Sequence, residues 1–160
     1  MQFDSKDSKK MWQLNFPSYT FSTKKQNGKP YIFDKIRKKY VPLTPEEWVR
    51  QNMVQFLVSE KNYPLSLLAN EVSIKYNELS KRCDTIVYSR VGEPLMIAEY
   101  KSADVEITQK TFDQIVIYNH QLKVKYLLVS NGLQHYCCKV NFENMTTEYL
   151  QEIPDYNSLI

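Results

Sequence analysis

Apolar and polar residues change their spacing along the chain, and the changes predict a short series of strands and helices. Tyr19–Lys25 and Lys29–Asp34 flank Gln26-Asn27-Gly28, and an Asn-Gly pair between two strand-like segments is a strong hairpin signal. A third short strand is expected at Lys39–Val41. The chain is therefore expected to begin its folded part with a β-hairpin.

Two segments carry apolar residues at helical spacing. Thr44-Pro45-Glu46-Glu47 predicts a helix start, with Thr44 as N-cap and Glu47 at the capping-box position, and the helix should run to about Lys61. A second helix is expected from Thr108 to Gln121. The apolar stripes are Val49, Met53, Phe56 and Leu57 in the first helix, and Phe112, Ile115 and Val116 in the second.

Five further strands and two short elements complete the expected order. Leu95–Ala98 is apolar at consecutive positions, as in a strand whose sheet is covered on both faces. The expected fold class is therefore α/β, with a central mixed β-sheet flanked by helices and an N-terminal β-hairpin. The strands are predicted at Glu71–Tyr76, Cys83–Tyr88, Pro94–Lys101, Lys125–Ser130 and Gln134–Val140, with short elements at residues 64–68 and 146–153.

Length and composition are those of one globular domain. The chain has 160 residues, 42% of them hydrophobic and 24% charged, which is enough for one core. Residues 1–17 show no periodicity and are expected to be a loose tail before a single domain at residues 18–160. Three cysteines are too few for a disulfide framework, and no apolar run is long enough for a membrane helix. A reduced, cytoplasmic protein is expected.

Positive charge is concentrated in the first third of the chain. Residues 1–50 carry 11 Lys and Arg against 5 Asp and Glu, whereas residues 51–160 carry 10 against 13. The cluster of Lys35, Arg37, Lys38 and Lys39 is a candidate for contacts with nucleic-acid phosphates. The alternative is a solvated basic hairpin with no partner.

The candidate chemistry lies in the segment from Asp84 to Lys101. A hairpin with a two-residue loop at Val91-Gly92 sets Asp84 opposite Glu99, and alternation adds Lys101 to the same face. Two adjacent carboxylates repel each other, so they indicate a hard divalent cation such as Mg²⁺, for which Mn²⁺ can substitute. Lys101 would orient water or stabilise charge on a phosphate. The alternative is a set of charged strand ends in solvent.

Other residues are candidates for supporting roles at this site. The carbonyl of Tyr100 is a further oxygen ligand for a metal, and Glu47 on the first helix is a third candidate acid, unless it acts only as a helix cap. Gln114 and Tyr118 share one side of the second helix, where they support the metal site, contact DNA or are ordinary helix residues.

Several of these segments resemble a known family, the N-terminal nuclease domain of type I restriction enzyme R (HsdR) subunits, which has the restriction-endonuclease-like PD-(D/E)XK fold. The resemblance covers about residues 31–156. It rests on Ile36-Arg37-Lys38-Lys39-Tyr40, Leu43-Thr44-Pro45-Glu46-Glu47, Lys81-Arg82-Cys83-Asp84, Phe112-Asp113-Gln114 and Val129-Ser130-Asn131-Gly132. It implies that Asp84, Glu99 and Lys101 are catalytic, with Gln114 and Tyr118 as the family's Gln-x-x-x-Tyr element and Glu47 as the helix acid.

The resemblance implies a Mg²⁺-dependent DNA endonuclease that acts in restriction or defence. Expected partners are DNA, other restriction-system or helicase subunits, and a second copy of the chain, with no membrane. The chain has no Walker A segment, so ATP-driven translocation is not expected of it, and a stand-alone protein is favoured over an excised domain. The rival functions are a non-catalytic nucleic-acid-binding or assembly module and a nuclease for RNA.

Overall fold

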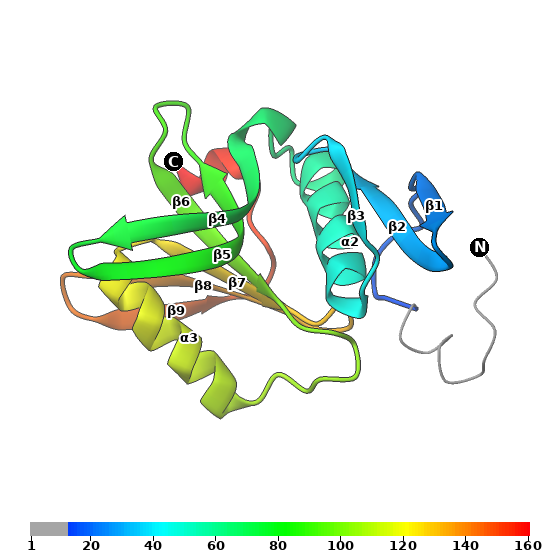
Figure 1. Cartoon of the computed structure of the whole chain (residues 1–160). Coiled ribbons are helices and arrows are strands. Elements are labelled where there is room, and N and C mark those ends of the chain that lie inside the picture. The colour runs from blue at the N-terminus through cyan, green and yellow to red at the C-terminus, as the bar shows by residue number, and fades with distance from the viewer. Residues whose placement is uncertain (1–12) are drawn as a thin grey trace.

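The structure is a computed structural model that describes residues 13–160, apart from the side chains of Tyr76, Tyr118, His120 and Gln121. Its centre is a six-stranded sheet in the order β4-β5-β6-β7-β8-β9 (Figure 1). The β6–β7 pair is parallel, and helix α3 (Gln109–Leu122) makes the crossover between them. The strands are β4 (Leu68–Tyr76), β5 (Leu79–Tyr88), β6 (Pro94–Tyr100), β7 (Tyr126–Ser130), β8 (His135–Asn141) and β9 (Thr146–Leu150).

A second, three-stranded antiparallel sheet precedes the large one. It consists of β1 (Thr23–Gln26), β2 (Lys29–Asp34) and β3 (Lys39–Pro42). Asn27 and Gly28 have φ values of 51° and 74°, the left-handed conformations that a type I′ hairpin turn needs. The predicted hairpin is confirmed, although its first strand begins at Thr23 rather than Tyr19.

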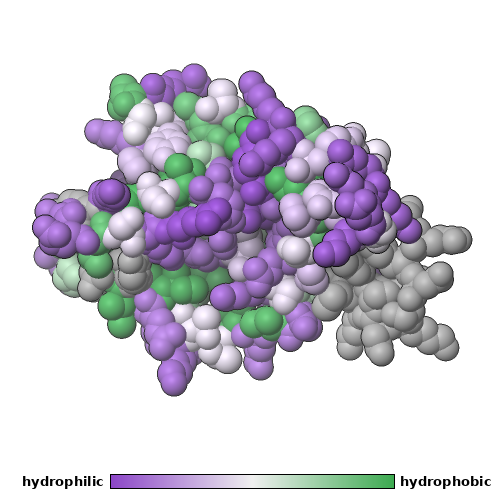
Figure 2. All heavy atoms as spheres, viewed as in Figure 1, coloured by the Kyte–Doolittle hydropathy of each residue, from purple (hydrophilic) through white to green (hydrophobic). Residues whose placement is uncertain are grey.

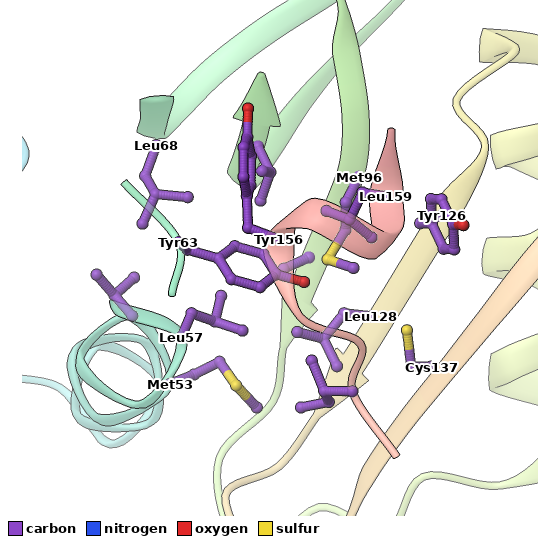
Figure 3. Packing of buried hydrophobic residues seen from close by; sticks show 14 of the residues in the cluster. Met53, Leu57, Tyr63, Leu68, Met96, Tyr126, Leu128, Cys137, Tyr156 and Leu159 are labelled. Carbon is purple, nitrogen blue, oxygen red and sulfur yellow. The ribbon is translucent and has the colours of Figure 1, made fainter. Parts of the chain in front are cut away.

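Helix α2 (Pro45–Glu60) lies between the two sheets (Figure 1). Its predicted start is confirmed, because the Thr44 hydroxyl accepts a hydrogen bond from the Glu47 amide at 3.1 Å. The predicted stripe packs on the large sheet through Val49, Met53 and Leu57 in a core that also holds Tyr63 and Tyr156 (Figure 3). Burial from two sides explains why polar residues of this helix are also buried.

The opposite face of the large sheet is covered by α3. Phe112 and Val116 are buried against β5, β6 and β7, as their spacing predicts. Cys137 and Cys138 belong to the two different cores, which confirms that these neighbours point to opposite faces of β8. The expected α/β architecture, a mixed sheet between helices, is therefore confirmed.

The described part of the predicted tail is packed rather than loose. Leu14 and Phe16 contact the core, and the Asn15 amide donates to the Gly132 carbonyl at 2.7 Å. A Cβ atom on Gly132 would lie 2.6 Å from the Leu14 side chain, so the segment sits close against this turn. Residues 1–12 of the predicted tail lie outside the described part of the chain.

The last elements are short. Residues 65–67 form a single 3₁₀ turn where a short turn or helix was predicted, and β9 occupies part of the predicted element at 146–153. A final 3₁₀ helix, Tyr156–Leu159, places Tyr156 against Tyr63 with ring centroids 5.7 Å apart (Figure 3). None of the described helices is long and apolar enough to span a bilayer.

Candidate active site

The β5–β6 hairpin brings the two predicted acidic residues together. Thr85 pairs with Ala98, Ile86 with Ile97 and Val87 with Met96, the register predicted from the sequence. The Asp84 carboxylate lies one step further and accepts a hydrogen bond from the Tyr100 amide at 2.8 Å. The predicted opposition of Asp84 and Glu99 is thus consistent with the ladder that adjoins them.

The loop of this hairpin differs from the prediction. A bulge at Val87 and Tyr88 makes Tyr88 pair with Pro94 rather than Leu95. The Ser89 amide donates to the Glu93 carbonyl at 2.8 Å and the Gly92 amide donates to the Ser89 carbonyl at 3.0 Å, so the loop is Arg90–Gly92, one residue longer than the loop predicted at Val91-Gly92. The bulge absorbs the difference, which is why the register near the acids still holds.

The two carboxyl groups share one site. Burial, and then the negative charge of Asp84, raise the pKa of Glu99 to about 7. Only 13% of the Glu99 side chain is exposed. The Glu99 carboxyl therefore binds a proton more readily than a glutamate in water does.

An unpredicted cation, the Lys81 ammonium, forms an ion pair with Glu99. Lys101 is half-buried after the end of β6, and its backbone amide donates to the Ser130 carbonyl at 2.9 Å. Among the described residues, the Lys101 ammonium forms no ion pair with an acid. Lys81 is thus the basic side chain that Glu99 binds here.

Strand β4, which pairs with the strand that carries Lys81, changes the face of the sheet to which its alternate residues point. Leu68 belongs to the core under α2, whereas Val72 and Ile74 belong to the core under α3. Glu71, between them, has a φ of 58°, a left-handed conformation that is uncommon for Glu. The β4–β5 ladder omits the pair that Glu71 would form with Asp84.

Strand β5 makes the same change at Asp84. Val87 lies in the core under α2, but Cys83, four residues earlier, lies in the core under α3. A regular strand would set both on one face. Because of this change, Lys81 and Cys83 lie on the same face of the sheet as Ile97 and Glu99. Asp84 is the residue at which the face changes.

Glu47 and Arg37 form ion pairs on the α2 side of the site. The Glu47 carboxylate accepts a hydrogen bond from Arg37 Nη2 at 2.5 Å and forms an ion pair with Arg50, whose Nε lies 2.9 Å away. Arg37 also binds Asp34, whose carboxylate oxygen accepts its Nε–H. Glu47 therefore neither completes a capping box nor joins Asp84 and Glu99 in a cluster of three, and Arg37 is half-buried in protein contacts.

Four side chains form a buried hydrogen-bond relay that leads from Tyr100 through Thr85 and Asn70 to Asp34. The Tyr100 hydroxyl donates to Thr85 Oγ1 at 2.9 Å, and the Thr85 hydroxyl donates to Asn70 Oδ1 at 2.7 Å. The Asn70 amide in turn donates to Asp34 Oδ2 at 3.0 Å. Burial acts to raise the pKa of Asp34, but hydrogen bonds from Asn70 and Arg37 outweigh it and hold the pKa below its usual value.

The remaining candidate residues are Gln114 and Tyr118 on α3 and the lysines after β2. Gln114 is exposed on α3, and the side chain of Tyr118 lies outside the described part of the structure. Lys35, Lys38 and Lys39 are exposed near the end of β2, as phosphate-binding residues would be. Hydrophilic residues cover much of the face shown in Figure 2, where β4, β5 and α2 lie in Figure 1.

The donor set at the acid pair fits a hard divalent cation. Asp84 and Glu99 supply adjacent oxygen ligands of the kind that Mg²⁺ prefers. The raised pKa of Glu99 and its ion pair with the Lys81 ammonium both indicate that positive charge is favoured there. No cluster of three or more His, Cys, Asp or Glu residues suited to a metal occurs within residues 13–160 as described.

These features define the class of protein. A mixed sheet between helices, with an acid pair on the β5–β6 hairpin, is a restriction-endonuclease-like α/β domain. Residues 45–154, more than half of the chain, match the family described as "Type I restriction enzyme R protein N terminus (HSDR_N)". The chain belongs to this family, as its sequence motifs predicted.

A solved structure supports the fold. The chain resembles a fragment of a putative HsdR subunit of a type I restriction enzyme from Vibrio vulnificus YJ016, with a TM-score of 0.51 and 18% sequence identity. The match covers 73% of this chain but 24% of the other, so the chain corresponds to about a quarter of that fragment. The comparison with curated protein sequences gave no match.

Proposed function

We propose that this protein is a Mg²⁺-dependent endonuclease that hydrolyses phosphodiester bonds of DNA in a restriction system. The observation that carries the proposal is the half-buried pair of Asp84 and Glu99 on the β5–β6 hairpin, where the negative charge of Asp84 contributes to the raised pKa of Glu99. Membership of the type I restriction enzyme R family supports the same function. Its setting would be the cytoplasm, with DNA and other restriction-system subunits as partners, and a second copy where both strands are cut.

Asp84, Glu99 and the Tyr100 carbonyl would hold Mg²⁺, or Mn²⁺ in its place. An ion held by these groups would supply activation of water and neutralisation of charge on the phosphate. Lys101, which has no acidic partner among the described residues, would hold the attacking water or a phosphate oxygen. Glu47 is less suited to a metal role because both of its carboxylate oxygens bind arginines.

Two further groups would contact the DNA. Gln114, exposed on α3, and Tyr118, one turn further along this helix, would support the site or bind a phosphate. Lys35, Lys38 and Lys39 would bind the DNA backbone without selecting a sequence, since lysine contacts with phosphates position DNA but do not distinguish bases. Binding through these lysines should weaken with added salt.

Plasmid nicking in Mg²⁺ or Mn²⁺ tests the proposal. Asp84→Asn and Lys101→Met should each reduce cleavage at least about a hundredfold, because each removes a group that would act on the reacting phosphate. Asp104→Asn, an exposed acid on the loop after Lys101, is the matched control and should cleave like wild type.

Cleavage that survives both substitutions would refute the assignment. If wild type neither cleaves DNA nor binds Mn²⁺ in a calorimetric titration, the rival function, a non-catalytic nucleic-acid-binding or assembly module, would be correct. Parallel assays with plasmid, single-stranded DNA and RNA decide the substrate class.

A further inference from the structure

The backbone at Asp84 has an unusual hydrogen-bond partner. A regular β4–β5 ladder would pair Asp84 with Glu71, but this pair is missing between Asn70–Thr85 and Val72–Cys83. Instead, Arg50 on α2 donates from Nη1 to the Asp84 carbonyl at 2.5 Å. A side chain from the helix thus binds the backbone where the ladder is interrupted.

Arg50 is itself held from several directions. Its Nη2 binds Glu71 at 2.5 Å and its Nε binds Glu47 at 2.9 Å, and its guanidinium carbon lies 5.9 Å from the centre of the Tyr100 ring. The residue is 8% exposed. Burial acts to lower the pKa of Arg50, but Glu47 and Glu71 outweigh it and raise the pKa, so the group stays charged. One planar guanidinium thus binds three elements at once, which a lysine ammonium cannot match.

We infer that Arg50 is a positioning residue for the metal site, an inference that rests on the proposed function. It binds both residues of the missing pair, the Glu71 carboxylate and the Asp84 carbonyl, and so fixes the point at which β5 changes face. Without it, the Asp84 carbonyl lacks this donor, and the backbone there is free to rotate. The Asp84 carboxylate would then lose its fixed place beside Glu99.

Arg50 is connected through Glu47 to Arg37 and so to strand β2. A series of ion pairs thus connects Arg50 to the small sheet without a direct contact between Arg37 and Asp84. Arg37 provides a matched control, because it binds the same Glu47 carboxylate but, among the described residues, forms no hydrogen bond or ion pair with Asp84 or Glu71. Loss of either arginine removes one of the two arginine partners of Glu47, and loss of Arg50 alone releases the Asp84 backbone.

The test compares Arg50→Gln with Arg37→Gln in calorimetric titrations with Mn²⁺, after circular dichroism shows that both variants are folded. Arg50→Gln should bind Mn²⁺ about tenfold or more weakly, the typical effect of losing a residue that orients a metal ligand. Arg37→Gln should remain within about twofold of wild type by the same reasoning. Equal affinities for all three proteins, or equal weakening in both variants, would overturn the inference.

A second measurement applies if Arg50→Gln does not fold. Arg50→Lys keeps the charge but cannot reach both Glu71 and the Asp84 carbonyl, so amide NMR signals of residues 83–86 and 99–101 should shift more than in Arg37→Lys. Unchanged signals would overturn the positioning role. If wild type binds no Mn²⁺, the proposed metal site is wrong, whereas the NMR comparison still decides whether Arg50 holds Asp84.

Discussion

Thr85 is the residue whose substitution best tests the buried polar relay. It is fully buried on β5, accepts a hydrogen bond from the Tyr100 hydroxyl and donates one to Asn70. Thr85→Val replaces the hydroxyl with a methyl group of nearly the same shape. The substitution therefore removes both hydrogen bonds without opening a cavity.

The expected cost follows from the groups that lose their partner. Tyr100 and Asn70 are 4% and 7% exposed, so water does not readily replace the threonine hydroxyl. A buried polar group left without a partner costs about 1–3 kcal/mol, and two such groups give about 2–6 kcal/mol of lost stability. Thr85→Ser retains the hydroxyl and loses one methyl group, which costs about 1 kcal/mol.

Urea unfolding of wild type, Thr85→Val and Thr85→Ser measures the difference. A double-mutant cycle with Tyr100→Phe should show coupling of about 0.5–1.5 kcal/mol, because the second substitution removes a hydroxyl that the first has already orphaned. The reasoning is refuted if Thr85→Val costs no more than Thr85→Ser, or if the two substitutions are strictly additive.

Three further predictions concern charge and packing. Lys81→Met should bind Mn²⁺ several-fold more tightly in calorimetric titration, because the Lys81 ammonium competes with a metal for Glu99; weaker binding would contradict this. The pKa of Asp34 is lower in the folded than in the unfolded state, so its stabilising contribution is complete at neutral pH and is lost as the pH falls below about 4. In Asp34→Asn, the free energy of unfolding measured in urea should therefore decrease less steeply than in wild type as the pH falls through this range. The same pH dependence in both proteins would refute the prediction. Gly132→Ala should cost about 1–2 kcal/mol more in thermal unfolding than Gly92→Ala. Both glycines have a φ of 84°, but only the Cβ at Gly132 would meet neighbouring side chains, so equal costs would rule out the close contact.

Most elements were predictable because local patterns determine them. The cap at Thr44, the Asn27-Gly28 turn and the stripe of α3 each depend on residues a few positions apart. The register of the β5–β6 hairpin was also predictable near the acids, although the loop was longer than expected and a bulge compensated for it.

The alternation of side chains along a strand did not predict which residues bind Asp84 and Glu99. Strict alternation along β5 sets Lys81 and Asp84 on opposite faces, and the change of face at Asp84 removes that restriction. Nothing in the sequence marks Glu71 as left-handed, because Glu is not a residue typical of that conformation. The ion pair of Glu47 with Arg50 could be predicted, since the two residues are three positions apart on one side of a helix.

The contacts of Asp34 and Arg37, at the end of strand β2 and just after it, indicate where a fragment that keeps this fold must begin. The family match starts at residue 45, yet Asp34 binds Asn70 and Arg37 binds Glu47, both within the matched region. A gene fragment that starts at α2 would leave the buried Glu47 carboxylate with one of its two arginine partners, Arg50, and would remove the Asp34 partner of Asn70. It would also expose the apolar surface that the small sheet covers. Grafting the domain into another protein therefore requires the small sheet as well.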